Sequence, residues 1–436
     1  MIEFHAPTPA DKAWVDELLA RGNYRGCDYN FTNLYVWSRA YNQRIARVDD
    51  FLVTHVCGRL GCSYMYPAGS GDIAAVIRAL EADAAEKGEP LRLVCLTPRQ
   101  MAELEEFFPG RFAYTADRDG YDYLYEVERL AELGGKKLHA KRNHINRFTA
   151  EYPDYCYEEL TPDRFGECMA LEREWRKAHE GHTSELCAEQ RAMQRAFEHF
   201  EELGLIGGCI YVGDRLAAFT YGSAVNDHTF DTHVEKADTE FDGAFTIINK
   251  LFAQHLPERF TLINREEDLG LDGLRQAKLS YHPAFLQHKF AAICMHPDEV
   301  ACKELWMKAF GDDEQFADSF IMRYYSRRRM LTAEAEGRMA AMLHLLPFRT
   351  ELGRTTYIYG VATDPAFRGR GLASQLMREA MRLIAERGDD AAFLIPTPGK
   401  EWLREFYGRF GFAGDVPARF VSADRFDFGT NCSSFK

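Results

Sequence analysis

The segment from Tyr359 to Met377 constrains the fold more than any other part of the chain. It overlaps Thr355–Ala362, a run rich in β-branched and aromatic side chains that suits a strand. Asp364 and Pro365 end this strand, and from Leu372 onward apolar residues recur at helical spacing. The sequence therefore predicts a strand that leads through a glycine-containing turn into the N-terminus of a helix.

The predicted turn is suited to binding phosphate. Gly369 and Gly371 can adopt left-handed conformations and leave the backbone open to an anion. Unpaired amides and the positive end of the helix dipole favour negative charge there, and Arg368 and Arg370 can add charge-assisted hydrogen bonds. The structural alternative is a connection in which the glycines only tighten the turn.

A second motif follows the predicted helix. Residues 391–395 are predicted to form a buried strand and residues 401–409 a short helix, which overlaps Phe406-Tyr-Gly-Arg-Phe-Gly-Phe412. Arg-x-x-Gly-x-Ala after a strand, with a later Phe-Tyr-x-x-Phe-Gly-Phe, resembles the GNAT acyl-CoA N-acyltransferase superfamily over residues 293–436.

The GNAT resemblance implies specific roles for residues of both motifs. It implies that acetyl-CoA is the cofactor, that a backbone amide near Val361 holds the developing oxyanion, and that Tyr407 is the general acid. A tyrosine of the aromatic core is the alternative for Tyr407. The loop residues that the resemblance assigns to the pyrophosphate of coenzyme A are Arg368, Gly369, Arg370, Gly371, Leu372 and Ala373. Ala373 stands where many members have glycine. The implied reaction is N-acetylation of a small-molecule or peptide amine.

Composition limits the remaining function classes. A chain of 436 residues with 46% hydrophobic and 28% charged residues is expected to form two or three globular domains. Its formal charge of −14 argues against general DNA binding. No signal peptide and no long apolar run is evident, so a cytoplasmic protein without a membrane span is expected.

Cysteine and histidine patterns predict neither a disulfide framework nor a metal centre. The cysteines are irregularly spaced, so reduced thiols are expected. His179 and His182, like His139 and His144, lack an evident third ligand, and the sequence therefore predicts no metal.

The first two thirds of the chain alternate between predicted helices and strands, with a division near residue 125. A basic stretch at 134–148, together with the segments 232–249 and 264–283, resembles the C-terminal domain of phosphatidylglycerol lysyltransferases and its soluble relatives over residues 1–292. That resemblance implies two GNAT-like lobes, about 1–125 and 126–292. The expected fold class is therefore α/β (α+β), with three GNAT-like units, of which residues 293–436 form the third.

Membrane-bound members of this second family transfer an aminoacyl group from transfer RNA to a lipid. The chain lacks their flippase-like membrane segment, so aminoacyl-tRNA stays an alternative partner while the lipid acceptor is in doubt. A buried ion-pair network that joins the lobes and a non-catalytic binding platform are the other readings. The motif positions predicted to line a polar cleft are Lys141, Arg142, Asn143, Glu235, Lys236, Asn249, Asn264, Glu266, Asp268, Arg275 and Lys278.

Overall fold

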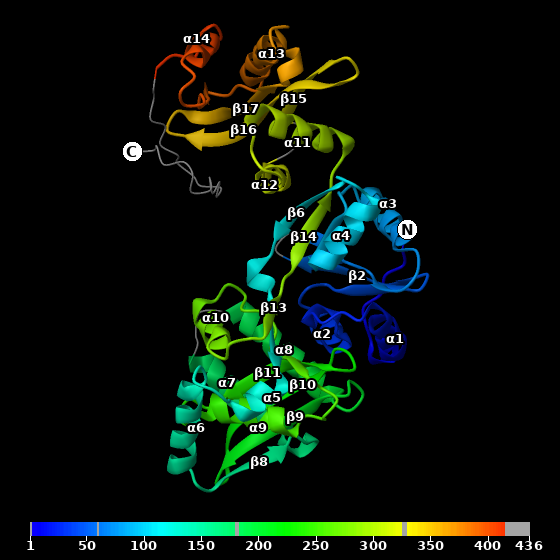
Figure 1. The fold of residues 1–436 in the computed structure, drawn as a ribbon, viewed down its shortest axis with the longest axis vertical. Coiled ribbons are helices and arrows are strands. Elements are labelled where there is room, and N and C mark those ends of the chain that lie inside the picture. Colours follow the sequence, from blue (N-terminus) through cyan, green and yellow to red (C-terminus); the bar gives the residue numbers. More distant parts are fainter. Residues whose placement is uncertain (1, 59–60, 179–182, 325–328, 415–436) are drawn as a thin grey trace. The chain divides into compact units, whose positions relative to one another are not determined.

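A computed structural model describes residues 2–58, 61–178, 183–324 and 329–414, and Figure 1 labels its elements. The chain divides into two compact units, Met1–Phe112 with Ala116–Cys294 and Ala113–Thr115 with Met295–Lys436. The predicted mixed α/β class is confirmed. The count of three GNAT-like units stays a prediction, and the end of the predicted domain 293–436, from residue 415, lies outside the described residues.

The first unit begins with a lobe built on a sheet of order β1-β2-β3-β5-β14-β6, in which β4 also pairs with β2. Helix α4 of this lobe begins at a capping box, because the side chains of Thr97 and Gln100 each accept a hydrogen bond from the other's backbone N–H. The strands are β1 (Arg44–Val48), β2 (Phe51–Gly58), β3 (Gly61–Met65), β4 (Ala68–Gly69), β5 (Arg92–Leu96), β6 (Phe112–Ala116) and β14 (Phe290–Cys294), and the helices are α1 (Lys12–Gly22), α2 (Phe31–Val36), α3 (Ile73–Glu86) and α4 (Pro98–Phe107).

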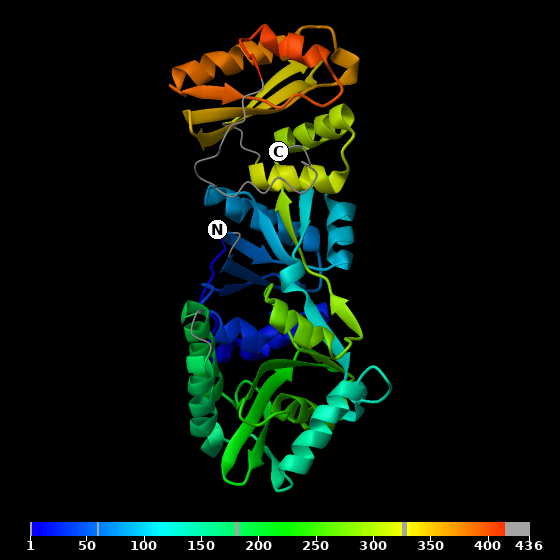
Figure 2. The same ribbon diagram turned by 90° about the vertical axis from the view of Figure 1, so that its left-hand side faces the viewer.

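The second lobe of this unit is built on a sheet of order β13-β7-β12-β11-β10-β9-β8. Its strands are β7 (Asp122–Glu126), β8 (Tyr155–Glu159), β9 (Ile206–Val212), β10 (Arg215–Ala224), β11 (Thr229–Ala237), β12 (Leu262–Asn264) and β13 (Phe285–Gln287). Its helices are α5 (Val127–Glu132), α6 (His139–Glu151), α7 (Phe165–Ala178), α8 (Thr183–Glu198), α9 (Ala244–His255) and α10 (Asp272–Leu279). The chain leaves the first lobe through β6 and returns through β14, and these two strands lie side by side in Figures 1 and 2.

Apolar packing joins the two lobes of the first unit. Leu18 and Phe31 of the first lobe share one buried cluster with Phe197, Phe219 and Tyr221 of the second. A separate core lies within the second lobe, where side chains of α5, α6 and α9 pack on the sheet. Since burial of apolar surface is the main stabilising contribution to folding, the lobe junction is an integral part of the unit.

The second unit contains a four-stranded sheet of order β15-β16-β17-β18. The predicted strand, turn and helix are confirmed, because β17 ends at Thr363 and α13 begins at Leu372. Helix α13 buries an apolar face against this sheet, as its helical spacing predicts. The elements are β15 (Met330–Ala335), β16 (Arg338–Thr350), β17 (Gly353–Thr363), β18 (Ala391–Phe393), α11 (Pro297–Phe310), α12 (Glu314–Tyr324), α13 (Leu372–Glu386) and α14 (Trp402–Gly408).

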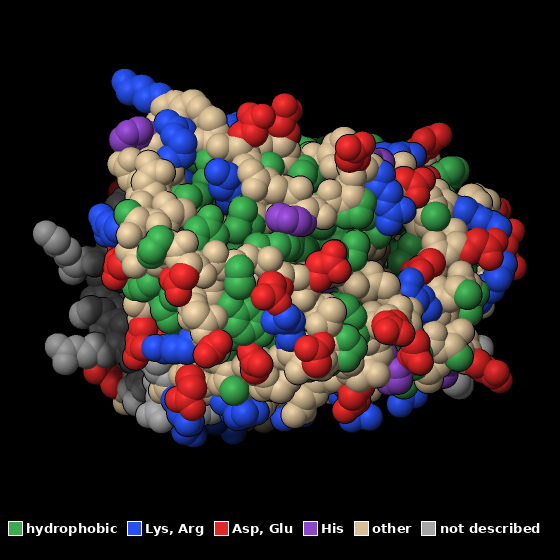
Figure 3. Space-filling view, turned by 90° about the horizontal axis from the view of Figure 1, so that it is seen from below, with side chains coloured by type: hydrophobic (Ala, Val, Ile, Leu, Met, Phe, Trp, Pro, Cys, Tyr) green, Lys and Arg blue, Asp and Glu red, His purple; other side chains and the backbone are tan. Residues whose placement is uncertain are grey.

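Three further observations bear on the predictions from composition. Eight described cysteines are free, but Cys62 is disulfide-bonded, so the expectation of reduced thiols throughout is wrong at Cys62. None of the described helices combines the length and apolar character needed to cross a bilayer. On the face drawn in Figure 3, basic and acidic side chains are interspersed around hydrophobic ones, and no continuous basic surface covers it.

Candidate functional site

The glycine turn of the second unit is open at the backbone. Gly369 and Gly371 have φ angles of 78° and 77°, in the left-handed region, and a Cβ added at either would meet no heavy atom within 4 Å. Gly371 is the N-cap of α13, and the first intrahelical hydrogen bond runs from the Gln375 N–H to the Gly371 carbonyl. The amides of residues 372–374 therefore have no partner within the helix.

Two arginines flank this turn. The Arg370 guanidinium lies over the Phe367 ring, 4.8 Å from its centroid, and pairs with Glu336 at 3.1 Å. Both partners of that pair are more than half exposed, so the ion pair is weak and Arg370 can turn to another anion. The Arg368 side chain is exposed.

Strand β17 diverges from its neighbour beside the turn. Its parallel pairing with β18 ends at Tyr357 and Phe393, whereas β17 continues to Thr363. Its register against β16 also shifts in this stretch, and Gly360 there has a φ of 62°. The backbone around Val361 thus lies where two parallel strands separate at their carboxyl ends, the usual ligand position in open α/β sheets.

Tyr407 belongs to the apolar core of this unit. It is only 8% exposed, packs against Phe406 and Phe412, and shares a cluster with Leu376 and Val361. Burial raises the pKa of Tyr407 to about 12, so its hydroxyl stays protonated at neutral pH. A hollow of about 390 Å³ in this unit is instead bordered by β15 and α13 and is not lined by Tyr407.

In the first unit, three of the predicted cleft residues come together around Arg265. Glu235 accepts hydrogen bonds from Arg265 at 2.8 Å and from Asn249 at 3.1 Å. The Lys141 ammonium lies 3.9 Å from the centroid of the Tyr281 ring. Burial lowers the pKa of Lys141 to about 8, with Arg265 adding to the shift and Glu235 opposing it.

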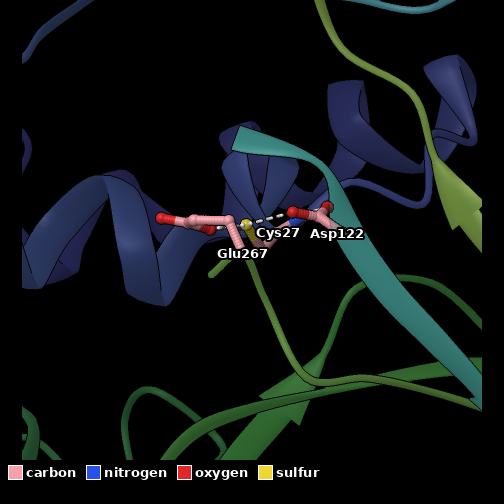
Figure 4. Close-up of side chains that lie close together, drawn as sticks. All are labelled: Cys27, Asp122 and Glu267. Atoms are coloured by element: carbon pink, nitrogen blue, oxygen red, sulfur yellow. Dashed lines mark hydrogen bonds between the residues drawn. The ribbon is translucent and has the colours of Figure 1, made fainter. Parts of the chain in front are cut away.

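Asn264 belongs to a different group, at the junction of the lobes. Its side-chain amide donates to Asp122 at 3.0 Å, and Asp122 also accepts from the backbone N–H of Cys27 at 2.9 Å. The Cys27 thiol lies between the carboxylates of Asp122 and Glu267 (Figure 4), with sulfur–oxygen distances of 3.2 and 3.4 Å. The buried Lys289 ammonium pairs with Asp122 at 2.6 Å. Burial raises the pKa of Glu267 to about 7.

Glu266 lies in a neighbouring polar group of the same junction. Its Oε1 accepts a hydrogen bond from the Asn33 amide at 2.9 Å and is 3.3 Å from Nδ1 of His233. The same Asn33 amide contacts Asp231 at 3.2 Å. Asn33 belongs to the first lobe and the other three to the second, so polar contacts accompany the apolar packing between the lobes.

Asp268 and Arg275 form a third group with Tyr123 and Arg118. Asp268 is fully buried and accepts from Tyr123 at 2.6 Å, from Arg275 at 2.8 and 2.9 Å, and from Arg118 at 3.1 Å. Burial alone would raise the pKa of Asp268, but the hydrogen bonds from Arg275 and Tyr123 hold it well below its usual range.

The remaining four predicted residues differ in their partners. Arg142 donates to the carbonyls of Leu133 and Gly135, at the end of α5, and Asn143 is exposed. Lys236 pairs with Glu189 at 2.9 Å. Lys278 is buried and donates to the carbonyls of Arg265 and Glu267. The contacts of the described residues thus divide the eleven positions among several groups.

Comparison with known proteins places this geometry in a family. The family model for the C-terminal part of phosphatidylglycerol lysyltransferase matches residues 19–293. The chain belongs to this family. A second model, for a GNAT acetyltransferase domain, matches residues 296–414. Both predicted resemblances are confirmed, and both domains belong to acyltransferase families.

Individual relatives of this phosphatidylglycerol lysyltransferase-like chain give little functional detail. A crystal structure of a conserved protein of unknown function from Bacteroides thetaiotaomicron is 44% identical, with a TM-score of 0.65, and covers 68% of this chain and all of that one. An uncharacterized protein of Mycoplasmoides gallisepticum is 26% identical over 39% of this chain. The matched region spans about half, 54%, of the length of that relative. The structure of L-PGS from Bacillus licheniformis is 14% identical, with a TM-score of 0.48, over 67% of this chain and 93% of that one.

Several polar residues of this lysyltransferase-like unit were missed by the sequence reasoning. Arg265 and His233 lie within the quoted segments 264–283 and 232–249, and Asp231 directly precedes the second of these, so the segments offered a signal for all three. Cys27, Asp122 and Lys289 lie outside those segments. Only the fold brings them together, because each comes from a different segment of the lobe junction.

Replacing Asp268 by asparagine is expected to lower the free energy of unfolding by about 1–3 kcal/mol at pH 7, because Tyr123, Arg118 and Arg275 lose their hydrogen bonds to a buried carboxylate. Because the pKa of Asp268 is lower in the folded state than in the unfolded state, its carboxylate stabilises the fold at pH values above the unfolded-state pKa of about 3.9. This contribution is lost as the pH falls through the folded-state pKa. The gap between wild type and Asp268→Asn should therefore narrow below about pH 4 in urea titrations.

The matched control is Asp119→Asn, which removes a half-exposed carboxylate that pairs with the same Arg275 at 2.7 Å. Its effect should stay below about 1 kcal/mol at either pH. Equal losses for both variants would contradict the structural role given to Asp268.

Proposed function

We propose that the second unit transfers an acetyl group from acetyl-CoA to a primary amine. The observation that supports this most is the open pair of left-handed glycines at the start of α13, beside the divergence of β17 from β18. A Cβ at either glycine would occupy the space in which a phosphate would lie. The fit of this turn to a diphosphate agrees with the GNAT model that matches the same residues.

In the proposed complex the residues of the turn bind and orient the nucleotide. The amides of Leu372 and Ala373 face the diphosphate, and Arg368 and Arg370 add charge-assisted hydrogen bonds. The amide of Val361 hydrogen-bonds the thioester oxygen, on which negative charge develops as the amine attacks. These are the positions that the sequence predicts for cofactor binding.

The proposed reaction forms a bond between the amine nitrogen and the acetyl carbon and breaks the bond between that carbon and sulfur. The proton that the amine loses balances the protonation of the departing thiolate. Because the pKa of Tyr407 is about 12 and that of a thiol about 8.5, Tyr407 acts better as a hydrogen-bond donor to the sulfur than as a full acid.

Calorimetric titration of the full chain with acetyl-CoA tests this proposal. One saturable site is expected, for which coenzyme A competes because the diphosphate is common to both. A titration without heat of binding at several temperatures, matched by an unchanged melting temperature in the presence of acetyl-CoA, would end the proposal.

The group around Arg265 favours a second candidate function, aminoacyl transfer by the first unit. The pKa of Lys141, about 8, is close to the range in which a lysine can give up and take back a proton near neutral pH. Glu235 and Asn249 add polar groups that can hold an amine. In this proposal aminoacyl-tRNA is the donor, and transfer RNA that stays charged with protein and candidate acceptors present would count against it.

The pKa of Lys141 can be measured directly, by reductive ¹³C-methylation of the full chain and an NMR titration. A value of about 8 is expected. Glu235→Gln should lower it further, because the Glu235 carboxylate favours the charged ammonium. The control variant Glu189→Gln, whose carboxylate pairs with Lys236, should leave it unchanged. A Lys141 pKa near 10.4 in the wild type would remove the argument for proton exchange.

A further inference from the structure

Asp231, His233 and Glu266 form a cluster with metal-binding geometry at the junction of the lobes. One ligand atom from each lies within 4.8 Å of the others. Nδ1 of His233 is 3.5 Å from Asp231 Oδ2 and 3.3 Å from Glu266 Oε1. For metal–ligand distances of about 2.0–2.1 Å, the corners of a tetrahedron lie about 3.3–3.4 Å apart. The two distances from His233 Nδ1 are therefore close to those between adjacent ligands on one ion.

The histidine is oriented by a second contact. Its Nε2 is 2.8 Å from Ser223 Oγ, and Ser223 in turn contacts the side chain of Asn30. With the ring proton on Nε2, the Nδ1 lone pair faces the oxygens of two carboxylates, which share one donor, the Asn33 amide. These three acceptors favour a cation between them. Metal-binding histidines are commonly held by such a bond to the other ring nitrogen. The register of β11 against β10 also shifts at His233, as happens at bulges that redirect a side chain.

The buried carboxylate of this cluster lacks a full set of partners. Asp231 is fully buried, and its Oδ1 accepts no hydrogen bond, while Oδ2 accepts from the Asn33 amide. The Asn33 side chain is also buried, and its Oδ1 has no hydrogen-bond partner. A buried carboxyl oxygen without a hydrogen-bond donor is costly, and a cation bound by this group would offset that cost.

The adjacent group around Cys27 does not have this deficit. Its thiol and the Asp122 carboxylate face the Lys289 ammonium, at 3.4 and 2.6 Å. That group therefore already contains its cation. Among the described residues, these two groups have ligand atoms close enough for a metal. In the part of the chain that the structure describes, no lysine or arginine forms an ion pair with Asp231, His233 or Glu266.

The geometry points to a binding site for one divalent first-row transition ion, such as Zn²⁺, held by Asp231, His233 and Glu266. One imidazole nitrogen and two carboxylate oxygens suit such an ion better than Ca²⁺ or Mg²⁺, which prefer oxygen alone. The Glu266 side chain is 22% exposed, so the site is open to solvent on that side. A fourth position is left for water or another ligand.

The test uses the full chain after treatment with a chelator. Titration with Zn²⁺ against a competing chelator is expected to give one site, and Mg²⁺ should not displace the ion. Asp231→Asn should weaken binding at least about 100-fold, and so should His233→Gln. Circular dichroism spectra and melting temperatures without metal establish that each variant is folded, and Co²⁺ gives an independent readout through its ligand-field absorption.

Glu267→Gln is the matched control, since it removes one carboxylate from the neighbouring Cys27 group. It should bind Zn²⁺ as the wild type does. Failure of the wild type to bind Zn²⁺, Mn²⁺ or Co²⁺ would overturn the inference, and so would loss of binding in Glu267→Gln but not in Asp231→Asn. None of these outcomes depends on acetyl-CoA binding by the second unit.

Discussion

Gly371→Ala is expected to weaken acetyl-CoA binding by the full chain about 10- to 100-fold, equivalent to the loss of about one hydrogen bond to a charged group. The added Cβ would lie in space that is empty in the structure and that the proposed diphosphate fills. It would also disfavour the φ of 77° that aims the first amides of α13 at the ligand. Calorimetry with acetyl-CoA measures the change.

Gly388→Ala is the control for this experiment. Gly388 follows the other end of α13, has a φ of 66°, and an added Cβ there would meet nothing nearer than 4.0 Å. Both substitutions impose a similar backbone strain of about 1 kcal/mol on the same helix. Only Gly371→Ala should change binding. An equal loss of affinity in the two variants would show that helix stability, rather than contact with the ligand, sets the affinity.

The second unit was predictable because its signals are local. Three signals agree with the structure: the β-branched and aromatic residues of Thr355–Ala362, the glycines at 369 and 371, and the apolar spacing from Leu372. Each depends on residues close together in the sequence. The burial of the Tyr407 side chain was less predictable. Its neighbours Phe406 and Phe412 are adjacent in sequence, but the cluster that buries it includes Leu376 and Val361 from other elements.

The first unit was less predictable because its polar groups are assembled from distant segments. The sequence motifs suggested one cleft, whereas alternation along β11 sends Glu235 and Lys236 to different partners, Arg265 and Glu189. Asn264 and Glu266 are likewise close in sequence but contact Asp122 and Asn33. The contact between Glu266 and Asn33 joins the two lobes, but it is a hydrogen bond and not an ion pair.

The expectation of no metal rested on histidine spacing in sequence, and that criterion does not apply to ligands brought together by the sheet. Asp231 and His233 are two residues apart on β11, and Glu266 follows β12, which pairs with β11 in parallel. Asp231 pairs with Asn264 in this parallel register, so Glu266, two residues further on, comes beside His233. A search for ligands across this strand pair could have found the cluster.

Lys289→Met is expected to lower the free energy of unfolding by about 3–5 kcal/mol, the largest effect on stability proposed for this chain. The side chain is 6% exposed and its ammonium is 2.5 Å from Asp28 and 2.6 Å from Asp122. Methionine fills a similar volume but leaves the buried Asp122 and the partly exposed Asp28 without their cation. Burial disfavours the charged form of Lys289, but the pairing with Asp122 and Asp28 raises its pKa well above the usual value. The charged ammonium therefore stabilises the fold throughout the neutral range, and this contribution is lost only at high pH.

Lys177→Met provides the comparison, because Lys177 and Glu174 form an ion pair at 2.7 Å in which both side chains are 69% exposed. Its loss should stay below about 1 kcal/mol. Chemical denaturation of both variants at pH 7 measures the difference. The double variant Lys289→Met with Asp122→Asn should recover part of the loss, because one uncompensated charge is then removed. Equal losses of unfolding free energy in Lys289→Met and Lys177→Met would show that the buried ion pairs do not stabilise the contact between the lobes. That contact would then depend on the apolar cluster that includes Leu18, Phe31 and Phe197.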